Sequence, residues 1–228
     1  MGDSLERAVA WDLYRVIHKA MRFALCGVTT LAGSTDAADD GAVGRLVDEW
    51  RDVRRVLAGH HRNEDRFCDP LIAIHAPDLV ASLAAEHALV DAQLARLDLQ
   101  VIAMTAMPST ARDAALHRFH LDAADFTATY LRHLRFEEGE VMPALNRAMD
   151  VDALARLTQR IRASVAPSDM VVFFRYMVPS MNLDERVDLL GAMLRTVPSD
   201  VFERLRRVAQ DRLSAADYAV VARRAGFD

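Results

Sequence analysis

Residues 133–138 read His-Leu-Arg-Phe-Glu-Glu, and a related stretch, His-His-Arg-Asn-Glu-Asp, occupies residues 60–65. In each stretch a histidine is followed four residues later by a glutamate and then by a second acid. Residues four apart lie on the same face of an α-helix, so the histidine and the glutamate of each stretch point in one direction. The apolar residues on both faces predict that these pairs are buried.

Apolar residues recur with helical spacing along the whole chain on either side of these stretches. We expect four long helices, at about residues 5–31, 42–74, 78–103 and 109–149. The spacing of Asp3 and Glu6 is that of a capping box at the start of the first helix, and Asp69-Pro70 is expected to kink the second. Short connections favour antiparallel neighbours, so the sequence predicts an all-α, up-down-up-down four-helix bundle.

The composition favours the same fold class. Nine glycines and seven prolines among 228 residues are too few for the turns of a many-stranded sheet. From Val151 onward prolines separate shorter helical segments. We therefore expect residues 1–150 to form the bundle and residues 151–228 to form a helical extension packed on it. The apolar stretch 170–177 is expected to dock this extension.

Charge and hydropathy argue against several classes of partner. The formal net charge is -5 and no basic stripe is present, which argues against nucleic acid. No stretch approaches the roughly 20 apolar residues of a membrane span, and the acidic N-terminus does not resemble a signal peptide. The expected location is therefore the cytoplasm, and no protein partner is indicated. Cys26 and Cys68 are expected to be free, reduced thiols near opposite ends of the bundle.

Each of the four predicted helices carries one histidine on its apolar stripe. These histidines are His18, His60, His87 and His133. Glu64 and Glu137 add two carboxylates, and such groups are costly in an apolar interior unless they have partners. Imidazole and carboxylate ligands that converge inside a helical bundle suit a pair of iron or manganese ions. A single zinc ion is the alternative, although zinc sites usually close at four ligands.

Two ferrous ions need more negative charge around them than two glutamates supply. Two glutamates offset only half of the four positive charges, so we expect a bridging oxide or hydroxide, or a further acid. Asp91, one turn after His87, is the best protein candidate. His61 could be an additional ligand, although a position at the rim of the site is favoured.

Other polar residues near the predicted ligands have simpler expected roles. Tyr14 and Tyr130 each lie one turn from a ligand candidate, where they are expected to pack beside the site and could support its ligands. Glu138 and Asp65 point about 100° away from the site around their helices. These two acids are therefore expected to lie in solvent.

The ordered motifs resemble the hemerythrin-like (HHE cation-binding) family over about residues 8–148. The resemblance rests on His18, His60-x-x-x-Glu64, Glu86-His87, His133-x-x-x-Glu137-Glu138 and Pro143. It implies a four-helix bundle with a non-haem di-iron centre. By analogy with the family, His18 and His60 would hold one iron, His87 and His133 the other, and Glu64 and Glu137 would bridge them.

The chain departs from the oxygen-carrying hemerythrins at Asp91, where those proteins have a second histidine on the third helix. It also places the carboxylate of the fourth helix one residue closer to its histidine. Fewer imidazoles and more carboxylate favour the oxidised state of the metal. This argues against reversible carriage of O2 and favours sensing, or redox chemistry with NO or peroxide. The expected function is binding of a small ligand, O2, NO or peroxide, for sensing, buffering or delivery. The alternative is a di-iron oxidoreductase, either a peroxidase or an NO-consuming enzyme.

Overall fold

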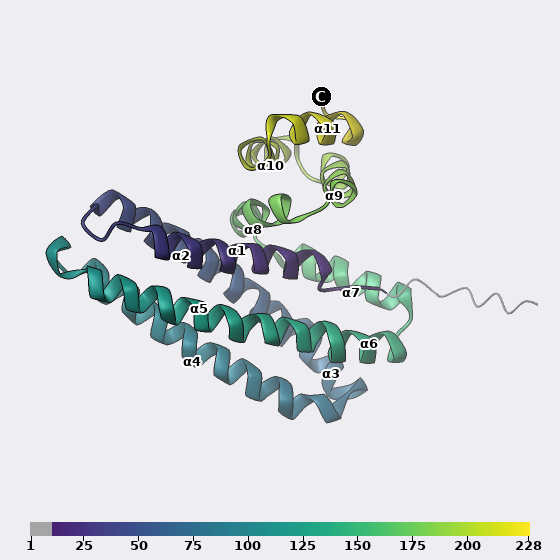
Figure 1. The fold of residues 1–228 in the computed structure, drawn as a ribbon. Helices are drawn as coiled ribbons and strands as arrows, with labels where there is room; N and C mark the ends of the chain where they lie inside the picture. The colour runs from purple at the N-terminus through teal and green to yellow at the C-terminus, as the bar shows by residue number, and fades with distance from the viewer. Residues whose placement is uncertain (1–10) are drawn as a thin grey trace, which may run out of the picture.

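The computed structural model describes residues 11–228, and within that range the chain forms helices and turns without any strand. The predicted all-α fold class is confirmed. Four long helices lie side by side, and consecutive ones run in opposite directions (Figure 1). They are α1 (Arg15–Ser34), α2 (Asp40–Asn63), α4 (Val80–Thr105) and α5 (Asp113–Phe136). Helix α1 contacts α2 and α5, and α4 contacts α5.

Two of the long helices pass through a π-helical turn into a short helix. Helix α2 continues through η1 (Glu64–Cys68) into α3 (Asp69–His75), and α5 continues through η4 (Glu137–Val141) into α6 (Met142–Ala148). In both cases the backbone N–H after the turn donates to the carbonyl of the motif glutamate, five residues earlier. Pro70 and Pro143 follow at the same spacing and interrupt the normal hydrogen-bond ladder, because proline has no N–H.

The first helix begins later than its sequence predicts. Trp11 to Tyr14 are not helical, although helical spacing extends through them. The side chain of Asn146 binds both the N–H and the carbonyl of Trp11, which holds that residue outside the helix. The Asp12 carboxylate then accepts the N–H groups of Tyr14 and Arg15, at 3.1 and 2.9 Å, and caps a helix that starts at Arg15. The expected capping box at residues 3–6 lies outside the described residues.

Short 3-10 turns, η2 (Pro77–Leu79) and η3 (Ser109–Ala111), precede α4 and α5. Five further helices follow. They are α7 (Val151–Ser164), α8 (Pro167–Ser180), α9 (Leu183–Thr196), α10 (Ser199–Arg212) and α11 (Ala215–Ala225). Asn182 and Glu185 form a capping box at the start of α9.

Helix α8, which contains the apolar stretch 170–177, joins two hydrophobic cores. Phe173 and Tyr176 pack in the core formed with α1 and α2, and Phe174 and Val178 pack in the core formed with α9 to α11. The Tyr176 hydroxyl donates to Glu49 of α2 at 2.9 Å. Helix α8 therefore lies between the two sets of helices: one of its faces packs against the long helices and the other against α9 to α11 (Figure 1).

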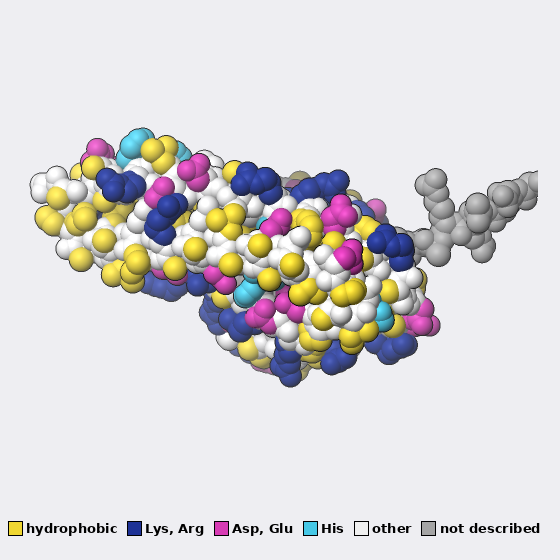
Figure 2. Space-filling view, turned by 90° about the horizontal axis from the view of Figure 1, so that it is seen from below, with side chains coloured by type: hydrophobic (Ala, Val, Ile, Leu, Met, Phe, Trp, Pro, Cys, Tyr) yellow, Lys and Arg dark blue, Asp and Glu magenta, His cyan; other side chains and the backbone are white. Residues whose placement is uncertain are grey.

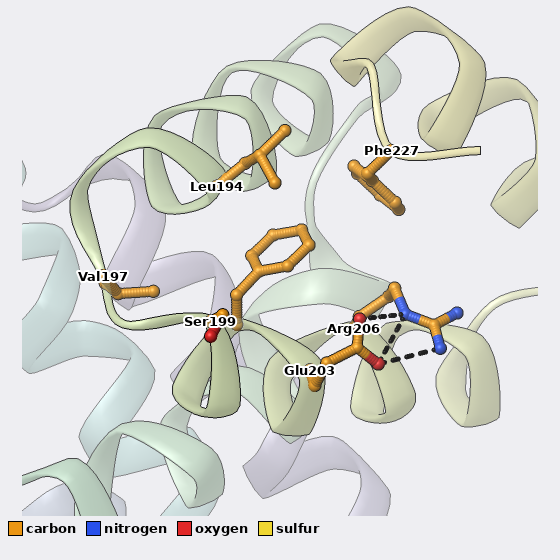
Figure 3. Close-up of a pocket in the computed structure, with 7 residues that line it drawn as sticks. Leu194, Val197, Ser199, Glu203, Arg206 and Phe227 are labelled. Atoms are coloured by element: carbon orange, nitrogen blue, oxygen red, sulfur yellow. Dashed lines mark hydrogen bonds and ion pairs between the residues drawn. The ribbon is translucent and has the colours of Figure 1, made fainter.

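A hollow of about 410 Å³ lies among α9, α10 and Phe227 (Figure 3). Its walls are largely apolar, and its Arg206 is already paired with Glu203. Its lining holds no histidine or cysteine, and its one serine, Ser199, has no histidine beside it in the lining to act as a general base.

Hydrophobic side chains also gather on the outer surface of the long helices (Figure 2). Leu99 and Ile102 of α4 and Leu121 of α5 are among the exposed large apolar residues. Within residues 11–228 no single helix combines the length and apolarity needed to cross a membrane. The segments 40–75 and 77–105 meet that test only as a pair, and they are bent by 115°.

Candidate metal centre

Six predicted ligand residues lie in the interior between the four long helices, and the exposed fraction of each is at most 9%. Four helices supply them at one level. His18 comes from α1, His60 and Glu64 from the end of α2 and the start of η1, His87 from α4, and His133 and Glu137 from the end of α5 and the start of η4. Each motif glutamate is therefore the first residue of a π-helical turn, a feature that is frequent at functional sites.

The six residues form two overlapping groups. One contains His18, His60, Glu64 and Glu137, and the other contains His87, His133 and the same two glutamates. Within each group, one potential ligand atom of every residue lies within 4.8 Å of the others. The shared glutamates therefore stand between two pairs of histidines, which is the arrangement expected for two neighbouring cations.

The inward-facing atoms of this cluster lack hydrogen-bond partners among residues 11–228. They are Nε2 of His18, His60 and His87, both carboxylate oxygens of Glu64, and Oε2 of Glu137. His60 Nε2 lies 3.1 Å from Glu64 Oε1, and His18 Nε2 lies 3.3 Å from Glu137 Oε2, but neither pair has hydrogen-bond geometry. Leaving a buried polar atom unpaired costs about 1–3 kcal/mol. Metal ions at these atoms would satisfy them, so the donor set fits a metal centre.

Two of the histidines form hydrogen bonds with carboxylates through Nδ1, the ring nitrogen that faces away from the centre. His18 Nδ1–H donates to Glu138 Oε1 at 2.9 Å, and His133 Nδ1–H donates to Glu86 Oε2 at 3.1 Å. The guanidinium of Arg22 donates a hydrogen bond to each carboxylate oxygen of Glu138, at 2.7 and 2.8 Å. A proton held on Nδ1 leaves the lone pair of Nε2 free to face the centre, as is usual for metal-binding histidines.

The expectation that Glu138 lies in solvent is wrong. Its side chain is 26% exposed and bridges His18 and Arg22 of α1. The helical-wheel estimate assumes regular α-helical geometry, whereas the π-helical turn starts at Glu137 and alters the direction of the next residue. Burial raises the pKa of Glu138, but the hydrogen bonds from His18 and Arg22 outweigh it and lower the pKa to about 2. Glu138 is therefore ionised at neutral pH.

Burial sets the protonation of the metal-free cluster. It raises the pKa of Glu64 and of Glu137 to about 8. It lowers the pKa of His87 to about 4 and that of His133 to about 3, where the neighbouring histidines add to the effect. The imidazoles of His87 and His133 are therefore neutral at pH 7, which is the form that binds metal. The two carboxyl groups need nearby positive charge in order to ionise.

Tyr14 and Tyr130 pack against the ligand histidines, as expected. The ring of Tyr14 stacks on His18 with 4.7 Å between centroids, and Tyr130 meets His133 edge-on at 5.5 Å. Both tyrosines are 3% exposed, and burial raises the pKa of each phenol. They close the cluster with aromatic surface on two sides.

Asp91 and His61 do not reach the shared glutamates. Neither residue belongs to the two groups that contain Glu64 and Glu137. The Asp91 side chain is 61% exposed and lies 3.9 Å from His61 Nε2, and His61 in turn lies 3.7 Å from Asp65. His61, Asp65 and Asp91 make up an outer cluster, which adjoins the centre at His87, because His61 and Asp65 also form a potential metal group with His87.

A comparison with protein-family models finds a match to the hemerythrin HHE cation-binding domain over residues 9–145. This match covers more than half of the chain. The chain belongs to the hemerythrin HHE family. The resemblance predicted from the motifs is thereby confirmed, and the six clustered ligand residues all lie within the matched range. No match was found among curated proteins or among solved structures.

Proposed function

We propose that this member of the hemerythrin HHE family holds a non-haem di-iron centre that binds a small ligand, O2 or NO. The observation that carries the proposal is the pair of ligand groups that share Glu64 and Glu137 and contain unpartnered, buried Nε2 atoms. His18 and His60 would hold one ion, His87 and His133 the other, and the glutamates would bridge them.

The donor set favours iron. Imidazole and carboxylate ligands suit iron or manganese, and carboxylate-bridged pairs of these metals occur inside helical bundles. Four histidines and two glutamates give fewer than the twelve donors of two six-coordinate ions, so positions remain open for a small ligand. When bound, the irons would supply those positions and redox chemistry. Since Asp91 stands outside, a bridging oxide would offset the remaining positive charge in full, and a bridging hydroxide would offset half of it.

The proposal includes the fold that presents this centre. Helices α1, α2, α4 and α5 would form an up-down-up-down four-helix bundle, with residues 151–228 as an extension docked through α8. The alternating directions in Figure 1 and the contacts of α1 with α2 and α5 support this assignment. Each helix then contributes one histidine at the same level, and none of the ligands comes from the extension.

Metal analysis of purified full-length chain after anaerobic loading with Fe²⁺ tests the centre. We expect two irons per chain to remain after desalting has removed weakly bound metal. At least one should be lost in Glu137→Ala, and both should be retained in His117→Ala, whose side chain is exposed on α5. Two irons retained in Glu137→Ala would overturn the assignment. Optical titration of the reduced, loaded protein with O2 and NO then tests ligand binding. Catalytic turnover of peroxide or NO, without reversible binding of O2 or NO, would favour the oxidoreductase instead.

A further inference from the structure

A second cavity, of about 330 Å³, opens beside the centre between α2–η1–α3 and α4. His61, Asp65 and Asp69 line one side, and His87 and Asp91 line the other. The rest of its lining is apolar, with no lysine or arginine. On the face seen in Figure 2, histidine is visible at the surface next to acidic side chains.

Among residues 11–228, no arginine or lysine neutralises the three aspartates of this cavity. Within residues 11–228, no such side chain lies within 4.0 Å of Asp65, Asp69 or Asp91. Acids elsewhere on the same helices do have partners: Asp98 of α4 binds Arg54 at 2.9 Å. Oδ1 of Asp69 is moreover buried without a hydrogen-bond partner. A cavity with three such carboxylates concentrates negative potential and attracts cations.

His87 connects this cavity to the centre. It is 9% exposed, its Nε2 has no hydrogen-bond partner, and it lines the cavity. It belongs to the inner group with Glu64 and Glu137 and also to an outer group with His61 and Asp65. The rings of His61 and His87 meet edge-on with 4.5 Å between centroids. A cation in the outer cluster would therefore be separated from the inner ligands by one imidazole.

We infer that His61, Asp65 and Asp91 form an outer site for a divalent transition-metal ion, from which the centre is loaded past His87. One imidazole nitrogen and two carboxylate oxygens suit Fe²⁺, Mn²⁺ or Zn²⁺. His61 Nε2 lies 3.7 Å from Asp65 Oδ1 and 3.9 Å from Asp91 Oδ2, which is too long for hydrogen bonds. Ligand atoms of a four-coordinate ion lie about 3.4 Å apart, given bonds of about 2.1 Å.

Asp65, whose side chain is 55% exposed, already lies in a potential metal group with His61 and His87. Asp91 is not in that group and would have to turn toward His61, a movement that is open to its 61% exposed side chain. The outer site binds its cation whether or not the inner site is filled. Its loading role rests on the proposed di-metal centre. The experiment therefore separates the two sites with variants that each remove only one of them.

Calorimetric titration of metal-free, full-length chain with Co²⁺ counts the sites. We expect three equivalents in the wild type, the third weaker than the others, and two in Asp65→Asn/Asp91→Asn. Stopped-flow absorption should show the inner centre of that variant filling on the order of tenfold more slowly at low salt, because electrostatic focusing is lost. Asp125→Asn/Asp211→Asn is the matched control, since both aspartates are exposed and removing them changes the net charge equally.

A wild type that takes up only two equivalents would overturn the outer site, as would a third equivalent unaffected by the Asp65 and Asp91 substitutions. Loading slowed equally by the control pair would overturn the loading role. If the proposed inner centre is wrong, the result differs: Glu137→Ala would then bind as many equivalents of Co²⁺ as the wild type. An equivalent lost only in the Asp65/Asp91 variant would still establish the outer site.

Discussion

Replacing Glu138 by glutamine should weaken metal binding on one side of the proposed centre. Glu138 accepts the Nδ1–H of His18 and is gripped by Arg22, so its charge reaches the centre through a single imidazole. Glutamine keeps the shape of the side chain but loses the charge, and its amide nitrogen can turn toward His18 and oppose the required tautomer. The ion held by His18 and His60 should be affected, and the ion held by His87 and His133 should not.

The size of the effect follows from this geometry. Loss of a carboxylate behind a metal-binding histidine typically costs 10–100-fold in metal affinity, which is about 1.4–2.8 kcal/mol. The ion pair itself is partly exposed, with 35% of the Arg22 and 26% of the Glu138 side chain accessible. A pair of that kind contributes at most about 1 kcal/mol to folding, or about 2–4 °C in Tm for a chain of this length. Metal affinity should therefore change more than stability.

Competition with a chromophoric chelator, applied to the full chain loaded with Co²⁺, measures both affinities. We expect one of the two inner equivalents to weaken 10–100-fold in Glu138→Gln. The control is Glu140→Gln, because Glu140 is an exposed acid in the same π-helical turn. Equal metal affinity of the two variants, or equal weakening of both equivalents in Glu138→Gln, would contradict the role of Glu138 behind His18.

Three further outcomes are expected. The free energy of unfolding of the metal-free protein, measured with urea, should fall by up to about 3 kcal/mol between pH 6.5 and 8. Burial raises the pKa of Glu64 and Glu137 to about 8, so the folded state keeps protons there that the unfolded chain has already lost. Bound metal should abolish this fall. Phe173→Ala should cost about 3–5 kcal/mol in urea unfolding, because this 7% exposed ring fills the core between α8 and the long helices. Iodoacetamide should label Cys26 but not Cys68 in the native protein, since Cys26 is exposed while burial raises the pKa of the Cys68 thiol, and mass spectrometry should find both labelled only after denaturation.

The sequence predicted the residues that depend on regular helical geometry. Spacing of four residues brought Glu64 to His60 and Glu137 to His133, and these pairs lie where the helices remain regular up to the glutamate. His18 and His87 could be found because each lies on the apolar stripe of its helix. The long helices were also predictable, since their apolar repeats extend over many turns.

Features that depend on tertiary contacts or on irregular turns could not be predicted in this way. The non-helical state of Trp11 depends on Asn146, a residue 135 positions away. The position of Glu138 depends on a π-helical turn that a regular helical wheel does not contain. One signal was available: Pro70 and Pro143 each follow a motif glutamate by six residues, and this shared spacing marks both turns.

The repeated motif makes the two glutamates equivalent, but their surroundings make the two halves of the centre different. Helices α2 and α5 run in the same direction (Figure 1), so their matching turns present Glu64 and Glu137 at one level. On one side His18 is fully buried and backed by the ion pair of Glu138 and Arg22. On the other, His87 borders the acidic cavity and the outer cluster. A small ligand or a metal ion from solvent would therefore meet the His87 side first, while the His18 side would retain its ion more firmly.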